Sequence, residues 1–183
     1  MDRLGLCLLG LCGMAVFACD QGEAPTGAAP DRSTSIPTVG CSAAITSPVE
    51  PSWRSKSVVR GPLGMYGDPL DIRQAGRWGP SAFWTKIPVL VAGQRSVTLR
   101  VAPRDRDRVG LTYGPRASSP ARSRNGTRGL AAAPRAVRFV ACQDQPVTAW
   151  AGGLALADRR PRVSLEVRVD GRGWRSLTIR ERA

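Results

Sequence analysis

Regular alternation between apolar and polar residues is the dominant pattern in the second half of the chain, and it predicts β-strands. In residues 96–101, three apolar residues share one face of an extended chain and three polar residues share the other. The clearest unit lies at 163–180, where two alternating runs flank the turn-forming sequence Asp-Gly-Arg-Gly at 170–173. These features predict a half-buried antiparallel strand and a C-terminal β-hairpin.

Trp174 stands at the start of the second strand of that hairpin. Its parity is opposite to that of Leu177 and Ile179, so an uninterrupted strand places it on the other face of the sheet. It shares their face only if a bulge at Gly173 shifts the register by one residue.

Five further runs predict strands, at 56–60, 83–91, 108–113, 136–142 and 148–156. Around 87–91 both parities are apolar, which is typical of a strand covered on both faces, whereas Pro88 lacks an amide donor and favours an edge or a bulge. Seven or eight short strands without a long helical pattern predict an all-β fold. An antiparallel immunoglobulin-like sandwich is the favoured architecture, with a small β-barrel as the alternative.

The N-terminal region has the pattern of an export signal. Residues 4–18 are apolar and uncharged, and they follow a single basic residue, Arg3. This run is shorter than the roughly 20 residues that a membrane-spanning helix needs. The sequence Val-Phe-Ala-Cys at 16–19 resembles the lipobox of bacterial lipoproteins, which implies lipidation of Cys19. Phe17 departs from the lipobox pattern, so ordinary cleavage and secretion is the alternative.

These features divide the chain into three parts. We expect a signal peptide at 1–18, a lipid-anchored flexible linker at 19–40 that is poor in large apolar residues, and a β-sandwich domain at 41–183. The expected location is the extracytoplasmic face of the cell membrane, and the alternative is release from the cell.

Two of the five cysteines, Cys41 and Cys142, fall in the expected domain. Outside the cytosol they can form one disulfide, and the alternative is a pair of buried free thiols. The chain contains no histidine and no CxxC pair, which leaves no zinc site of the usual ligand types. We expect no cofactor and no metal.

The chain is strongly basic, with a formal net charge of +13. Over residues 41–183, 25 basic residues stand against 10 acidic ones. Residues 114–135 lack apolar periodicity and predict a long arginine-rich loop, which favours anionic lipid or an anionic cell-wall polymer as a partner. Nucleic acid is not expected. The alternative is a solvated face, because the chain has 25 arginines and only 2 lysines, a bias typical of GC-rich genomes. The candidate anion-binding residues are Arg116, Arg122, Arg124, Arg128 and Arg135.

Catalytic motifs are absent from the sequence. Without histidine there is no Ser-His-Asp or Cys-His arrangement, and neither lysine has a serine three residues before it. Asp68 and Asp71 are interpreted as part of a turn. The sequence therefore predicts a protein that is not an enzyme.

The order of several segments resembles a group of small exported proteins of actinobacteria for which we know no activity. In that group a second cysteine precedes the segment matching 165–169 and is implied to pair with the one matching Cys142. Here 158–163 contains no cysteine, so Cys41 is the remaining partner in the expected domain. We expect a non-catalytic binding or structural module, or else an accessory subunit of a transporter or secreted enzyme. The segments that carry the resemblance are 58–63, 87–93, 97–103, 111–114, 137–142, 150–153 and 165–169.

Overall fold

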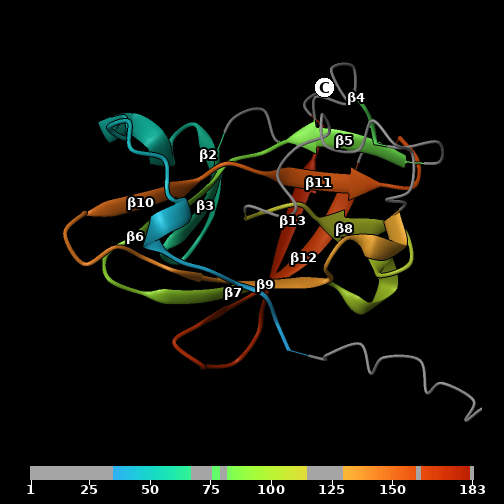
Figure 1. Ribbon diagram of the computed structural model, residues 1–183. Coiled ribbons are helices and arrows are strands. Elements are labelled where there is room, and N and C mark those ends of the chain that lie inside the picture. Colours follow the sequence, from blue (N-terminus) through green and yellow to red (C-terminus); the bar gives the residue numbers. More distant parts are fainter. Residues whose placement is uncertain (1–34, 67–75, 79–81, 115–129, 160–161, 182–183) are drawn as a thin grey trace, which may run out of the picture. The chain divides into compact units, whose positions relative to one another are not determined.

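The computed structural model describes residues 35–66, 76–78, 82–114, 130–159 and 162–181. They belong to a compact unit that begins at Ser35 (Figure 1). The fold therefore starts before residue 41, where the sequence placed it, because β1 (Thr38–Val39) already pairs with a strand of the first sheet. The expected signal peptide, Cys19 and most of the expected linker lie outside the described residues.

The strands form three sheets, which confirms the all-β, antiparallel-rich sandwich. Sheet A has five strands in the order β1-β9-β7-β12-β13, sheet B has the order β10-β6-β3-β2, and sheet C has the order β4-β5-β11-β8. The strands other than β1 are β2 (Ser57–Arg60), β3 (Leu63–Tyr66), β4 (Gly76–Trp78), β5 (Ala82–Lys86), β6 (Val89–Ala92), β7 (Ser96–Val101), β8 (Val109–Leu111), β9 (Ala136–Val140), β10 (Val147–Trp150), β11 (Gly153–Leu156), β12 (Arg162–Val169) and β13 (Arg175–Arg180).

The strands are more numerous than the seven or eight expected. The structure adds β1, β3 and β4, and it divides two predicted long strands into the pairs β5/β6 and β10/β11. Each sheet runs from one edge strand to another in its described residues, so none closes into the small barrel considered as the alternative. The pairing of β1 with β9 is parallel, whereas the other recorded pairings are antiparallel.

One main hydrophobic core receives side chains from all three sheets. Sheet A contributes the alternating residues that its sequence pattern predicts, such as Val97 and Leu99 of β7 and Leu165 of β12, all fully buried. Sheet B contributes Met65 and sheet C contributes Leu154. Burial of these apolar surfaces is the main stabilising contribution of the fold.

Sheet B is covered on both faces, as the apolar run at 87–91 predicts. Val89 and Val91 face the main core, whereas Leu90 belongs to a separate cluster with Trp53. Trp53 is carried by the short 3₁₀-helix η2 (Pro51–Arg54). It packs so closely on Gly64 of β3 that a Cβ at this glycine would lie 2.3 Å from its ring.

A single bent β-ribbon joins sheets B and C. Lys86 pairs with Gly153 in sheet C, and Val89 pairs with Trp150 in sheet B, in one continuous antiparallel register. Between these pairs the ribbon passes from one sheet to the other at Pro88, where the missing amide interrupts the ladder. This bend is the physical reason why β5/β6 and β10/β11 are separate strands (Figure 1).

Glycines allow the close contacts at the bend. A Cβ on Gly153 would lie 1.9 Å from the carbonyl oxygen of Thr85, and one on Gly152 would lie 2.2 Å from the ring of Tyr113. The Tyr113 hydroxyl donates a hydrogen bond of 2.9 Å to the carbonyl of Ile87. Complete burial raises the pKa of this phenol, so it stays a neutral donor.

Candidate anion-binding site

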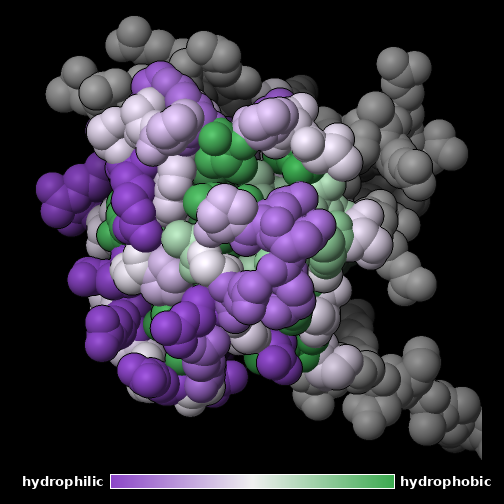
Figure 2. Space-filling view, turned by 90° about the vertical axis from the view of Figure 1, so that its left-hand side faces the viewer, coloured by the Kyte–Doolittle hydropathy of each residue, from purple (hydrophilic) through white to green (hydrophobic). Residues whose placement is uncertain are grey.

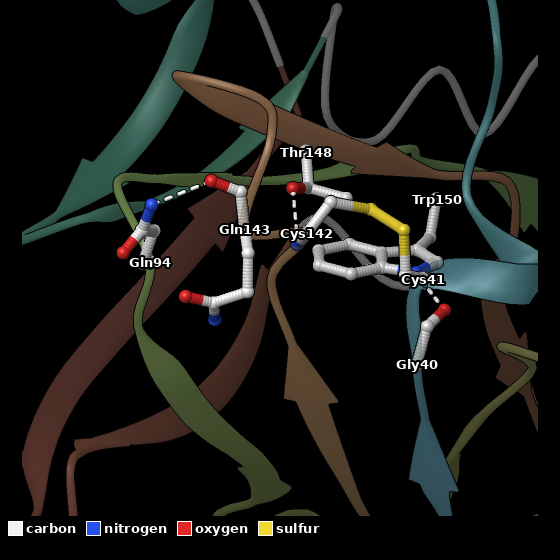
Figure 3. Close-up of a disulfide and its surroundings, with 7 residues drawn as sticks. All are labelled: Gly40, Cys41, Gln94, Cys142, Gln143, Thr148 and Trp150. Atoms are coloured by element: carbon white, nitrogen blue, oxygen red, sulfur yellow. Dashed lines mark hydrogen bonds between the residues drawn. A yellow bond between two sulfur atoms is a disulfide. The ribbon is translucent and has the colours of Figure 1, made fainter.

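A disulfide joins Cys41 and Cys142, with their Cα atoms 5.0 Å apart. Cys41 begins the 3₁₀-helix η1 (Cys41–Ala43), and Cys142 follows β9. The indole Nε1 of Trp150 donates to the Gly40 carbonyl at 3.0 Å, and the Cys142 amide donates to Thr148 Oγ1 at 2.9 Å (Figure 3). The disulfide and these bonds fix the first residues of the fold against β9 and β10.

One potential group of metal ligands occurs in the described part of the chain, and it consists of the two disulfide sulfurs and Asp144. Sulfurs that are bonded to each other cannot act as thiolate ligands. Asp68 and Asp71 lie outside the described residues.

The expected arginine-rich loop is only partly described. Arg116, Arg122, Arg124 and Arg128 lie outside the described residues, and their role stays a prediction. Arg135 is described, and its Nη1 donates to the carbonyls of Leu130 and Ala133 at 3.0 and 2.8 Å. Partial burial lowers the pKa of its guanidinium, and the charge of Asp107 opposes this effect.

Arg135 therefore stabilises the turn around η6 (Leu130–Ala132), and its role in anion binding stays a prediction. The turn covers the outer face of sheet C, where Leu130 and Ala133 pack with Trp84 and Ala155.

A different set of arginines converges on a cavity of about 250 Å³, which we call the arginine cavity. Three turns, which join β2 to β3, β6 to β7 and β12 to β13, bring its lining residues together. Four arginines and one acidic residue line it, giving a net charge of +3, and its apolar wall includes Pro62 and Val167. The charged lining residues are Arg60, Arg95, Asp170, Arg172 and Arg175.

The turn between β12 and β13 holds the acidic residue of this cavity. Asp170 and Gly171 have φ angles of +47° and +75°, and the Arg172 amide donates to the Val169 carbonyl at 2.9 Å. Positive φ at both central residues is typical of the type I′ turns that match the twist of a hairpin. The Asp-Gly sequence therefore produces the tight turn predicted for it.

Asp170 and two of the arginines are held within the fold. Arg95 Nη1 lies 2.6 Å from Asp170 Oδ2, and the Ser96 amide donates to Asp170 Oδ1 at 3.1 Å. The bond from Arg95, followed by the amide bond, lowers the pKa of Asp170. Arg60 Nε donates to the Ser176 carbonyl at 2.9 Å.

The other two arginines of the cavity, Arg172 and Arg175, are available to a ligand. Both are exposed, and neither guanidinium forms a hydrogen bond or a salt bridge with a described residue, although the charge of Arg172 contributes to the lowered pKa of Asp170. The cavity thus combines two anchored guanidinium groups with two that can turn toward a bound anion. Arginine forks match the geometry of phosphate and carboxylate oxygens.

Figure 2 shows one face of the molecule, on which hydrophilic residues predominate and hydrophobic residues gather in the upper centre. Among the described residues, Ile36 is the large hydrophobic residue that stands out as exposed, at 38%. No described helix has the length and apolar character that crossing a bilayer requires.

The sequence did not point to the arginine cavity. Its four arginines are spread from residue 60 to residue 175, and none belongs to a binding motif or to the arginine-rich loop. Their convergence depends on the pairing of strands that are distant in the sequence. The turn signals near 61, 93 and 170–173 were the local features that could have directed attention to them.

No family model matches the chain, and neither a curated protein nor a solved structure is similar enough to it to count as a match. Its function therefore has to be inferred from the geometry of its own residues.

Proposed function

We propose that this domain is a non-catalytic module of the cell envelope that binds anionic groups in the arginine cavity. The observation that carries the proposal is the ratio of four arginines to one aspartate, together with two guanidinium groups that form no hydrogen bond or salt bridge to the described residues. An anion entering this site replaces solvent around charges that the fold has already brought together.

The size of the cavity favours a small group. A volume of about 250 Å³ is below the roughly 300–1,000 Å³ of pockets that enclose drug-sized molecules. A phosphate group, alone or as part of a larger molecule, has suitable size and charge.

The disulfide supports an extracytoplasmic location. Such bonds persist in oxidising compartments and are rare in the cytosol. Together with the export signal expected at 1–18, it favours a domain that acts outside the cell membrane, either tethered through Cys19 or released.

The test is the binding of inorganic phosphate to the double variant R172S/R175S. Exposed charge pairs contribute about 0.5–1 kcal/mol each, so removal of two should weaken binding roughly 5- to 30-fold. The matched control is R162S/R180S, because these paired residues lie at the opposite end of the same hairpin and remove the same charge. Binding can be followed by amide chemical shifts of the turn at 170–173 during a phosphate titration.

Equal affinities of the two double variants for phosphate would refute the proposal, because only the total charge would then matter. Added sodium chloride should weaken binding to the wild type, since screening acts on the exposed guanidinium groups.

A further inference from the structure

A second cationic cavity lies on the outer face of sheet A, and we call it the outer-face cavity. Its volume is about 360 Å³. Two arginines and three hydroxyl residues line it, and no carboxylate does. These five lining residues are Thr38, Ser96, Thr98, Arg138 and Arg168.

Strand register explains why these residues meet. Arg138 of β9 pairs with Thr38 of β1 on one side and with Thr98 of β7 on the other, and Thr98 also pairs with Arg168 of β12. Residues opposite each other on neighbouring strands have their Cβ atoms about 5 Å apart on the same face. The cationic and hydroxyl groups therefore form one row across four strands.

Both arginines of this row retain donors for a ligand. Arg138 Nε donates to Ser96 Oγ at 2.8 Å, and no other hydrogen bond of this side chain to a described residue is found. The guanidinium of Arg168 lies over the ring of Trp174, 4.6 Å from its centroid, and its Nε is buried. No hydrogen bond from its Nη groups to a described residue is found, so these groups are the donors that remain for a ligand.

The two cavities are neighbours across the β12–β13 turn. Gly171 lines the outer-face cavity, whereas Asp170 and Arg172 on either side of it line the arginine cavity. Along β12, Arg168 faces the outer-face cavity and Val167 faces the arginine cavity. Successive residues of a strand point to opposite faces, so the cavities open on opposite sides of the hairpin end.

We propose that the two cavities are adjacent subsites for one linear polymer that carries repeated phosphate groups and passes around the hairpin turn. This inference rests on the proposed function, because it assumes that the arginine cavity binds phosphate. A polymer is favoured over a membrane surface, since a flat bilayer can approach only one side of the hairpin end at a time. The hydroxyl groups of the outer-face cavity suit the polar linkages between phosphates.

Two linked subsites predict a specific dependence on chain length. A ligand that reaches both cavities binds more tightly than its separate groups, because the second contact is intramolecular. At constant ionic strength, wild-type protein should bind long-chain inorganic polyphosphate at least tenfold more tightly, per chain, than inorganic phosphate or pyrophosphate.

The experiment compares three double variants with inorganic phosphate and with long-chain polyphosphate. R138S/R168S should bind inorganic phosphate at the arginine cavity with wild-type affinity but lose at least tenfold in polyphosphate affinity. R172S/R175S should lose affinity for both ligands, and the control R162S/R180S should resemble the wild type. The single variant R138S gives the same test without altering the contact with Trp174, and it should lose part of the polyphosphate affinity.

The outcomes separate the two proposals. If R138S and R138S/R168S bind polyphosphate as the control does, the second subsite is refuted while the arginine cavity stands. If R172S/R175S binds inorganic phosphate as the control does, the proposed function fails. If vesicles rich in anionic lipid bind the protein as tightly as polyphosphate does, and R138S/R168S and R172S/R175S lose affinity for the vesicles equally, a membrane surface replaces the polymer as the ligand.

Discussion

Removal of the Cys41–Cys142 disulfide should lower the free energy of unfolding by about 4–5 kcal/mol. The two residues are 101 positions apart, so the bond closes a loop that includes most of the fold. Loop-closure entropy for about 100 residues corresponds to ~4.7 kcal/mol at 25 °C. The loss should arise mainly in the unfolded state, which gains conformations when the loop opens.

The native contacts around the bond indicate that the fold itself survives this change. The variant C41A/C142A should retain the pairing of β1 with β9 and the hydrogen bond from Trp150 to Gly40 that the native structure contains. Cys142 is only 1% exposed, so loss of its sulfur adds a small packing cost.

Denaturant unfolding followed by tryptophan fluorescence measures the effect in wild type and in C41A/C142A. The variant should have a lower midpoint and a larger m-value, because its unfolded state is less compact. The free energy of unfolding of wild-type protein treated with a reductant should approach that of the variant, and the reductant should not change the stability of the variant itself. A loss below about 1 kcal/mol would refute the entropic argument, and an unfolded variant would refute the claim that the remaining contacts hold the N-terminal segment.

Three further predictions concern the bend and one exposed acidic group. Gly153→Ala should cost about 3 kcal/mol, measured by denaturant unfolding, because its Cβ would meet the carbonyl of Thr85, whereas Gly173→Ala, with open space around it, should change stability by less than about 0.5 kcal/mol. Tyr113→Phe should cost about 1–2 kcal/mol in the same assay, since it leaves a buried carbonyl at the bend without its donor, and an unchanged midpoint would contradict this. Hydrogen bonds, first from a neighbouring lysine and then from a serine and a tyrosine, lower the pKa of Glu50 from 4.5 to about 2. Its lowered pKa stabilises the fold above pH 4.5, and this contribution disappears as the pH falls to about 2. Glu50→Gln should therefore be less stable than wild type at pH 7 and equal to it near pH 2. Thermal unfolding across this pH range measures the difference in stability, and a difference that does not change with pH would refute the assignment.

The strands that are specified by local alternation could be predicted from the sequence. β7 and the β12–β13 hairpin appear where their apolar residues alternate, and the C-terminal hairpin turns at the predicted Asp-Gly. Trp174 has the parity of the outer face, where the guanidinium of Arg100 lies 3.7 Å from its ring centroid. No bulge is needed to explain its position.

Features that depend on tertiary contacts could not be predicted. β3 contains Gly64, and glycine within a strand argues against a strand prediction. The glycine is required because the ring of Trp53 packs directly against it, a contact that the sequence does not show. β1 has only two residues and pairs with a strand about 100 residues away. The arginine cavity has the same origin, because its charges come from three turns and the adjoining strand ends, whose proximity results from sheet formation.

The bent ribbon that joins sheets B and C has a consequence for how the fold avoids misalignment. In β6, Val89, Leu90 and Val91 are all apolar, so the residues of this strand alone would tolerate a shift of its pairing by one position. In β11 a similar shift would exchange large leucines with a glycine and an alanine. The register is continuous through the bend, so the pairing of β11 in sheet C determines the pairing of β6 in sheet B. The two sheets are therefore aligned correctly together or not at all.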